Sequence, residues 1–408
     1  MNISWRERGA FLAIVLVLVG YTWGTWRFFT LPIPGGNDFL AHYTAWEAYI
    51  KFDINPYSDE AALYTQKAIY GRPARSGEDE NRLTYPFYSI LVHGPFILLD
   101  YALARAVYMT LLQIVIVLGV ILTMRLIQWE APIWLMGVFM AWSILNYPEA
   151  RAIILGQFAP FAFLSVVGCI YLYQRGHDGW AGAALVMSTI KPTLVFLLVP
   201  FLLIYFITRR RWKAAVGFLT TLGLLIAGSF LALPSWFSDF ILRLQTYSSY
   251  TVGQSPVWLL CHQYLPFLGR AGEILITLML LSGLLFDWWL TFRKDGGRRF
   301  YWSLGLTLVV SNLIVPRSAT TNYVMLLLPT IWVFSVLDQR WRWGRAAVVI
   351  SMLVLMVGQW WLHAATVVGN QEQAVLFLPW PVLLGLVLVC GRRWLLANIR
   401  LPEPGVLA

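Results

Sequence analysis

Charged residues are scarce in this sequence: Asp, Glu, Lys and Arg make up 12% of its 408 residues, against about 25% in soluble proteins. Cysteine is also scarce, and Cys169, Cys261 and Cys390 are too scattered for a disulfide framework or a metal site. The sequence has no GxGxxG, Walker, HExxH or CxxC motif. With 59% hydrophobic residues, these absences exclude a soluble enzyme, a nucleic-acid binder and a disordered chain.

What the sequence does contain is long apolar runs, which are long enough to cross hydrocarbon as helices. No small-x-small cleavage pattern follows the first run, so we expect it to be retained as a membrane helix. The runs predict an all-α integral membrane protein of about twelve spans in a single domain, 1–408. The predicted spans are 10–26, 104–124, 131–147, 158–174, 179–190, 193–208, 213–232, 272–291, 300–314, 320–337, 344–364 and 375–391.

The basic residues indicate how these spans are oriented. With both termini in the cytoplasm, 18 of the 30 basic residues but only 7 of the 20 acidic residues fall in the inner segments or in the inner ends of the adjoining spans. The remaining segments hold 12 basic and 13 acidic residues, an asymmetry that the positive-inside rule predicts. The net charge of +10 therefore indicates the topology of a membrane protein and not binding to nucleic acid. We expect a multi-pass protein of the plasma (inner) membrane, with membrane lipids as partners. The inner clusters include Arg209 to Arg211, Arg293-Lys294, Arg392-Arg393 and Arg400.

The segment 85–99 does not fit this count of spans. It is apolar but short, with His93, Gly94 and Pro95 in its middle. If it crossed the bilayer, every later basic cluster would face outward, so we interpret it as a re-entrant or interfacial helix. A model with thirteen spans is the alternative.

The longest segment outside the predicted spans is the first outer loop, 27–103. Between Asn37 and Asp100 it holds nine acidic and five basic residues. Its pattern predicts amphipathic helices over 38–51 and 59–70, the first with Tyr43, Trp46, Tyr49 and Ile50 on one face. A second outer segment covers 233–270.

Asp38 is the earliest candidate for chemistry at an aqueous outer face. Pro34-Gly35-Gly36 predicts a sharp break in the chain, and Asp38 then falls near the start of the next helix. A carboxylate there is also typical of a helix cap, so the position by itself favours a capping and a catalytic role equally. No second Asp or Glu stands close to Asp38 directly after the first span, so we expect no metal.

Other polar residues fall in the outer segments or within the apolar runs, where charge is costly and function is a default hypothesis. For Lys191 and Arg317 the alternative is snorkelling of a long side chain to the headgroups. The candidates are Arg82, His93, Glu149, Arg151, Gln157, Lys191, Gln254, His262 and Arg317.

A series of short motifs resembles family 87 of the GT-C superfamily of membrane glycosyltransferases. Order and spacing agree over nearly the whole chain, although each motif is weak when taken singly. The matching pieces are Asp38-Phe39 with Tyr43 and Ala45, Asn55-Pro56-Tyr57, Tyr85-Pro86-Phe87 with Pro95, Gly156-Gln157-Phe158, Ala181-Gly182, Lys191-Pro192, Gln254-Ser255 and Pro316.

The resemblance implies an outer-facing site under the first loop, with the acid at the Asp38 position as catalytic base and a polyprenyl-phosphate sugar, expected to be mannose, as donor. We expect a lipid or glycan acceptor, no cofactor, and substrate contacts from Lys191, Arg317, Arg151, Gln157, Gln254, His262, Tyr85 and Arg82. Many relatives carry one or two histidines where this chain has Ser318 to Asn322. Arg317 or His262 would then make those contacts, which leaves the acceptor and the sugar open.

Two other functions are compatible with the composition. A transporter or lipid flippase would often show inverted repeats and broken helices, neither of which is evident in the sequence, and it leaves the long first outer loop unexplained. A non-catalytic membrane scaffold is the second alternative.

Overall fold

The structure is a computed structural model and describes residues 5–35, 38–250, 254–293, 297–368 and 372–397. Every regular element in these ranges is a helix, which confirms the all-α fold class. Gly36, Lys294 and Arg400, which figured in the predictions above, lie outside the described residues.

Six helical segments in the described ranges are long and apolar enough to cross a membrane, and a bent pair of helices would add a seventh. The bent pair is α7 (Tyr147–Leu155) and α8 (Ala159–Gln174), whose axes differ in direction by 115°. The predicted number of twelve spans stays a prediction. The six segments are Phe11–Thr30, Tyr101–Leu126, Trp212–Ala232, Gly269–Arg293, Thr320–Arg340 and Gly344–Thr366.

The other predicted spans also contain helices, but shorter ones. The predicted spans 179–190 and 193–208 fold as α9 (Asp178–Val186), a 3₁₀ turn η4 (Met187–Ile190), α10 (Pro192–Val195) and α11 (Leu198–Thr208). Lys191 has φ −118° and ψ 82°, outside the helical region, and Pro192 cannot donate a hydrogen bond to the preceding turn. The helix therefore breaks at these two residues.

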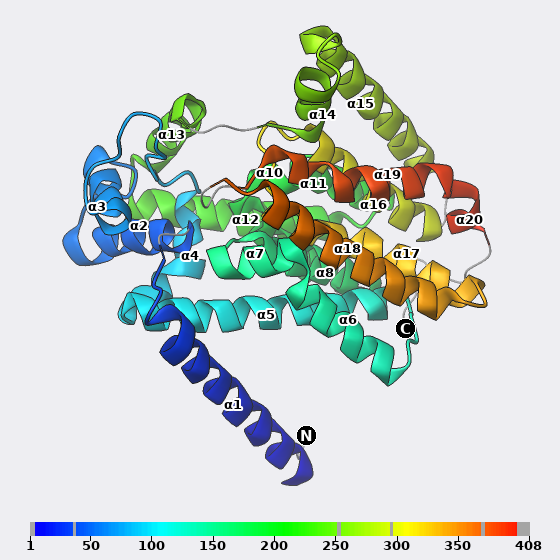
Figure 1. Cartoon of the computed structure of the whole chain (residues 1–408), viewed down its shortest axis with the longest axis horizontal. Helices are drawn as coiled ribbons and strands as arrows, with labels where there is room; N and C mark the ends of the chain where they lie inside the picture. The colour runs from blue at the N-terminus through cyan, green and yellow to red at the C-terminus, as the bar shows by residue number, and fades with distance from the viewer. Residues whose placement is uncertain (1–4, 36–37, 251–253, 294–296, 369–371, 398–408) are drawn as a thin grey trace. The chain divides into compact units, whose positions relative to one another are not determined.

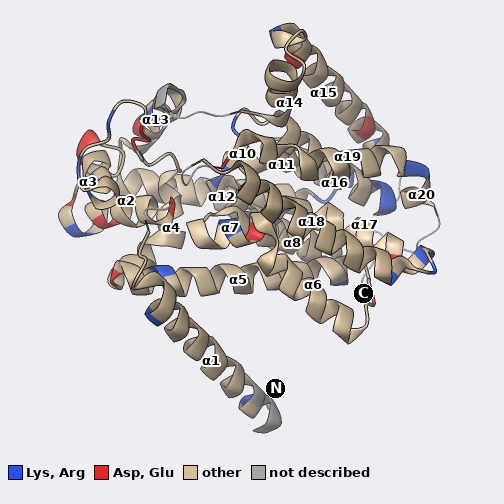
Figure 2. Cartoon of the chain, viewed as in Figure 1, with Lys and Arg blue, Asp and Glu red and all other residues tan. Residues whose placement is uncertain are grey.

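The long helices expose apolar side chains along much of their length. In α1 (Trp5–Thr25) the side chains of Phe11, Ile14 and Val17 are each more than half exposed, and in α18 (Gly344–Thr366) so are Val354 and Val357. Charged residues of α5 (Tyr101–Leu126) and α18 are confined to the helix ends (Figure 2). Such surfaces suit hydrocarbon rather than water, and the chain is a membrane-embedded helical protein.

The described chain divides into two compact units. The first comprises Met1–Ile114, Ile153–Gln157 and Ala227–Thr251, and α1 is bonded to α5 within it through Thr22 and Thr110 (3.0 Å). Its further helical elements are η1 (Trp26–Thr30), α2 (Asp38–Phe52), α3 (Asp59–Tyr70), η2 (Phe87–Ser89), α4 (Ile90–His93), η3 (Gly94–Leu98) and α13 (Trp236–Tyr250).

Helices α2 and α3 match the predicted helical ranges 38–51 and 59–70 to within a residue, and they pack side by side (Figure 1). Ser58 caps α3 by accepting a hydrogen bond from the Ala61 N–H (3.1 Å). Tyr43 and Trp46 are buried, and Ile50 is 48% exposed. Segment 85–99 folds as the short turns η2, α4 and η3, and its re-entrant or interfacial placement stays a prediction.

The second unit comprises Val115–Ala152, Phe158–Ile226 and Val252–Ala408. Its core contains α16 (Gly297–Ile314), in which Ser303, Thr307, Ser311 and Asn312 are buried and hydrogen-bonded. For example, the Trp288 indole N–H donates to Thr307 Oγ1 (2.8 Å). The elements not yet given are α6 (Ile133–Leu145), α12 (Trp212–Ala232), α14 (Pro256–Leu259), η5 (Leu260–Tyr264), α15 (Gly269–Arg293), η6 (Thr320–Leu326), α17 (Leu327–Arg340), η7 (Ala374–Phe377), α19 (Pro379–Cys390) and α20 (Arg392–Leu396).

Candidate active site

Asp38 lies in the first turn of α2 in the first unit, as the sequence predicted. Gly35, three residues before Asp38, has φ +68°, a conformation that glycine adopts without strain. The positive end of the helix dipole favours a carboxylate at this position. Phe39, the next residue, is fully buried and stacks on Tyr108 with ring centroids 4.4 Å apart, which anchors the start of the helix.

Gln157 donates a hydrogen bond from its side-chain amide to Asp38 Oδ2. It follows Gly156, which has φ +70° and lies between α7 and α8. A methyl group on Gly156 would lie 2.4 Å from Cβ of Phe39, so glycine allows the turn and α2 to approach each other closely. The structure thus joins two residues that the sequence predicted separately, 119 positions apart.

Tyr85, a third predicted residue, also lies near Asp38. Burial and the negative charge of Asp38 raise the pKa of the Tyr85 phenol well above its usual value. The phenol therefore stays protonated and keeps a hydrogen to donate. The backbone carbonyl of Tyr85 accepts a hydrogen bond from the Tyr57 hydroxyl (2.8 Å), which holds the chain at Tyr85 against the segment between α2 and α3.

His42 is a member of this cluster that the sequence analysis missed. Its ring packs edge-on against Tyr85, with centroids 4.4 Å apart, and stacks on His93 at 4.6 Å. His93, which the sequence did single out, lies with Nε2 3.2 Å from the Tyr108 hydroxyl. The signal was present, because residues four apart lie on the same face of a helix and His42 follows Asp38 by four.

Arg82 lies elsewhere in the first unit, in a network of ion pairs. Its guanidinium pairs with Asp59 and with Glu80, and Arg243 of α13 pairs with the same Asp59 at 3.1 Å. Hydrogen bonding from Arg82, with its positive charge, lowers the pKa of Asp59. In this arrangement Arg82 holds the outer loop together, and its contact with substrate stays a prediction.

In the second unit, Arg151 pairs with Glu372 at 3.6 Å. Glu372 is largely buried and also accepts hydrogen bonds from the Tyr147 hydroxyl (3.0 Å) and the Thr320 hydroxyl. Glu372 was not among the residues predicted from the sequence, although it is the sole acidic residue between the last two predicted spans. Because a carboxylate partly neutralises Arg151, its role toward a phosphate stays a prediction.

Segment 318–322, where the resemblance leads us to expect histidines, is engaged in internal hydrogen bonds. Thr320 bonds Glu372, and the Ser318 hydroxyl lies 3.2 Å from the Tyr323 hydroxyl. The Ser318 N–H donates to the backbone carbonyl of Gln254 (3.3 Å). The structure therefore brings Gln254 next to the Pro316–Arg317 segment.

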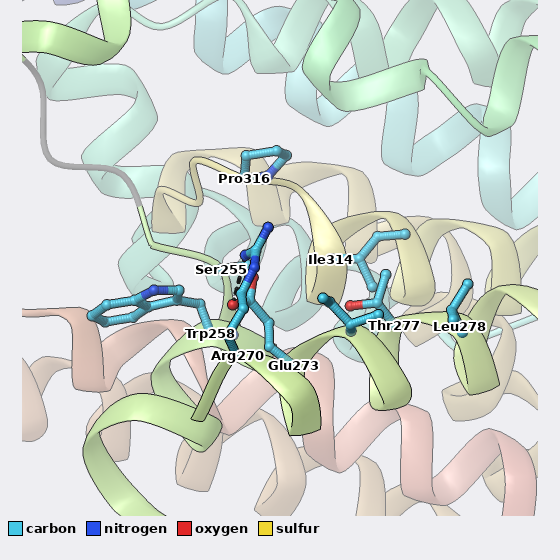
Figure 3. A pocket seen from close by; sticks show the side chains of 9 residues that line it. Ser255, Trp258, Arg270, Glu273, Thr277, Leu278, Ile314 and Pro316 are labelled. Atoms are coloured by element: carbon cyan, nitrogen blue, oxygen red, sulfur yellow. Dashed lines mark hydrogen bonds and ion pairs between the residues drawn. The ribbon is translucent and has the colours of Figure 1, made fainter. Parts of the chain in front are cut away.

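A cavity of about 420 Å³ lies beside this segment, within the second unit. Its lining includes Trp258 of α14, and Trp258 stacks on the predicted residue His262, with centroids 4.8 Å apart. His262 Nε2 lies 3.0 Å from Glu273 of α15. The lining residues, shown in Figure 3, are Ser255, Trp258, Arg270, Glu273, Ile274, Thr277, Leu278, Ile314 and Pro316.

Lys191 is half-buried at the break between η4 and α10 in the same unit. That position fits both predictions made for it, a phosphate ligand and a snorkelling cation. Among the residues that the structure describes, no group of three or more His, Cys, Asp and Glu side chains could hold a metal ion. Independence from metal stays a prediction.

Comparison with known proteins adds one finding. The sequence model of glycosyltransferase family 87 matches residues 83–316, which is more than half of the chain. No curated protein and no solved structure matches. The matched segment includes Tyr85 and Gln157 but begins after Asp38, so the bond from Gln157 connects the matched segment to the predicted base. On the strength of this match and the membrane-embedded helical fold, the chain belongs to glycosyltransferase family 87.

Proposed function

We propose that this chain is an inverting glycosyltransferase that moves a sugar, expected to be mannose, from a polyprenyl-phosphate donor to a lipid or glycan acceptor. Asp38 acts as the general base. The observation that carries this proposal is the contact between Asp38 and Gln157, with Tyr85 beside them, in a chain of a glycosyltransferase family. The site would lie on the extracytoplasmic face, which is where the distribution of basic residues predicts the first loop to be.

The chemistry requires only one carboxylate. Glycosidases use two carboxyl groups because one must protonate the departing oxygen. A polyprenyl phosphate departs as a stable anion, so no general acid is needed. The Asp38 carboxylate takes the proton of the acceptor hydroxyl while the hydroxyl oxygen bonds to the anomeric carbon. At the same time the bond between the anomeric carbon and the phosphate oxygen breaks, and the phosphate departs with that electron pair. Attack opposite the departing phosphate inverts the anomeric carbon.

Gln157 and the basic residues have different parts in this scheme. The Gln157 amide holds one oxygen of Asp38, which orients the carboxylate toward the acceptor hydroxyl. The phosphate needs positive charge where its own negative charge grows during departure. Lys191, Arg317 and Arg151 are the candidates, because an ammonium group or a guanidinium fork can hydrogen-bond phosphate oxygens.

The test is sugar transfer by the purified full-length chain. Radiolabelled polyprenyl-phosphate mannose, with membrane lipids as acceptors, should give labelled product or slow release of free sugar. Asp38→Asn keeps the shape of the side chain but removes its basicity, so transfer should fall by at least about 100-fold, with the melting temperature close to wild type. Glu60→Gln, the same change in the exposed first turn of α3, is the matched control and should stay active.

Two outcomes would contradict the proposal. Full transfer by Asp38→Asn would remove this residue as the base. If the wild-type chain gives neither transfer nor hydrolysis with any polyprenyl-phosphate sugar, a transporter, a flippase or a scaffold becomes the better interpretation.

A further inference from the structure

The cavity between α14, α15 and the end of α16 has two chemically different ends. In Figure 3 the Trp258 side chain lies at one end, Ile314, Thr277 and Leu278 lie toward the other, and Ser255, Arg270 and Glu273 lie between them. Ile274 and Leu278 are 47% and 55% exposed on α15, a helix apolar enough to cross the membrane. The part of the cavity from Trp258 to Arg270 and Glu273 is therefore its polar end. The opposite end continues onto an exposed apolar face of α15.

The charges of the polar end are balanced. Arg270 pairs with Glu273 at 2.8 Å, and the same carboxylate oxygen lies 3.0 Å from His262. A phosphate at this place would be attracted by the Arg270 guanidinium but repelled by the Glu273 carboxylate. A neutral group with hydroxyls can instead donate to the carboxylate and accept from the guanidinium.

Trp258 gives this end an aromatic wall of fixed orientation. His262 stacks on the indole with an angle of 18° between the ring planes, and Glu273 in turn holds His262. Ser255 caps α14 by accepting from the Trp258 N–H (2.9 Å), which fixes the backbone of the same residue. A flat, held indole next to a carboxylate and a guanidinium is suited to the C–H face and the hydroxyls of a sugar ring.

We propose that this cavity binds the neutral, hydroxyl-rich headgroup of a glycolipid, with the sugar against Trp258 and its hydroxyls toward Glu273 and Arg270. The lipid chain follows the face of α15 that carries Ile274 and Leu278. A cavity of about 420 Å³ lies within the range of small-molecule sites and accommodates a single sugar ring. This proposal concerns binding only and goes beyond the transfer reaction.

The test is photo-cross-linking of the full chain in phosphatidylcholine nanodiscs with a monohexosyl diacylglycerol that carries a diazirine near the glycerol end of an acyl chain. Mass spectrometry of the cross-linked peptides should place the label on residues 269–278. Trp258→Ala should weaken labelling, measured against probe concentration, by about tenfold or more. Trp361→Ala, at an exposed tryptophan of α18, is the matched control and should label as wild type does.

Further variants keep the result interpretable. Thr277→Trp fills the cavity from α15 and should abolish labelling even if Trp258→Ala fails to fold. Asp38→Asn should bind the probe normally whatever it does to transfer, so failure of the proposed reaction and failure of this site are distinguishable. Normal labelling in Thr277→Trp, or label located elsewhere on the chain, would overturn the proposal.

Competition separates a sugar from an anion. Unlabelled monohexosyl diacylglycerol should displace the probe at lower concentration than phosphatidic acid of the same chain length. Stronger displacement by phosphatidic acid would show a site for anionic lipid and would overturn the neutral headgroup proposed here.

Discussion

At the scale of single residues, the hydrogen bond between Gln157 and Asp38 makes the sharpest prediction. Gln157→Leu removes the donor, and hydrogen bonds to charged groups contribute about 1.5–3 kcal/mol. Transfer should therefore fall by about 10- to 150-fold, mostly in kcat, because the base would no longer be oriented. Steady-state transfer rates at several donor concentrations check this. If Gln157→Leu instead raises KM with kcat unchanged, Gln157 is a substrate ligand and not a positioning residue.

The predicted phosphate ligands are tested by removing their charge. Lys191→Met and Arg317→Met should each lower the rate of transfer. By analogy with loss of a donor to a developing anion, each variant should lose roughly 2–4 kcal/mol of transition-state stabilisation. The snorkelling interpretation expects near-normal kinetics with a small loss of stability.

Transfer measured against donor concentration decides between the two interpretations. Lys213→Met, an exposed cation at the start of α12, is the control and should be neutral. Wild-type kinetics in both variants would remove Lys191 and Arg317 from the site.

The sequence could identify Asp38, Gln157 and Tyr85 as separate candidates, but it could not show that they meet. Asp38 and Gln157 are 119 positions apart in the sequence. Their contact depends on the turn at Gly156, whose positive φ was not predicted. His42 was missed because a histidine on a buried helix face is ordinarily a core residue. Glu372 was missed because its partners Arg151 and Thr320 come from distant segments.

At the scale of elements, the turn at Gly156 should be intolerant of any side chain. Gly156→Ala places a methyl group 2.4 Å from Cβ of Phe39 and keeps a residue at φ +70°, so we expect a loss of about 1–3 kcal/mol and reduced transfer. Gly168→Ala in α8, where a methyl group would have no neighbour within 4 Å, should leave both nearly unchanged. Thermal melting of the two variants, followed by their transfer rates, provides the comparison; equal melting temperatures would contradict the packing described for Gly156.

Helix prediction worked best where a pattern is local. The helices predicted over 38–51 and 59–70 are present with these bounds to within a residue, and the capping serine Ser58 directly precedes the second. It worked less well at 179–208, where two predicted spans fold as shorter pieces around Lys191 and Pro192. An apolar run predicts that a segment is buried in hydrocarbon. Whether the segment forms one continuous helix depends on single residues within the run.

At the scale of the whole molecule, the distribution of basic residues predicts the topology. A cysteine at Ser76, in the first outer loop, should react with an impermeant maleimide added to intact cells. A cysteine at Gly296, which lies outside the described residues, should react only after the membrane is permeabilised. The reverse labelling of the two positions would invert the topology and move Asp38 to the cytoplasmic side.

The first unit is discontinuous in sequence, and this has a consequence for biosynthesis. Asp38 emerges early from the ribosome, but Gln157 and Arg243, which bond to Asp38 and to Asp59, are translated much later. At 5–20 residues per second, the 205 residues from Asp38 to Arg243 take about 10–40 s to make. Until Gln157 is made, the nascent chain carries the predicted base without the amide that orients it. Until Arg243 is made, segment 27–103 lacks one of the two cations that pair with Asp59.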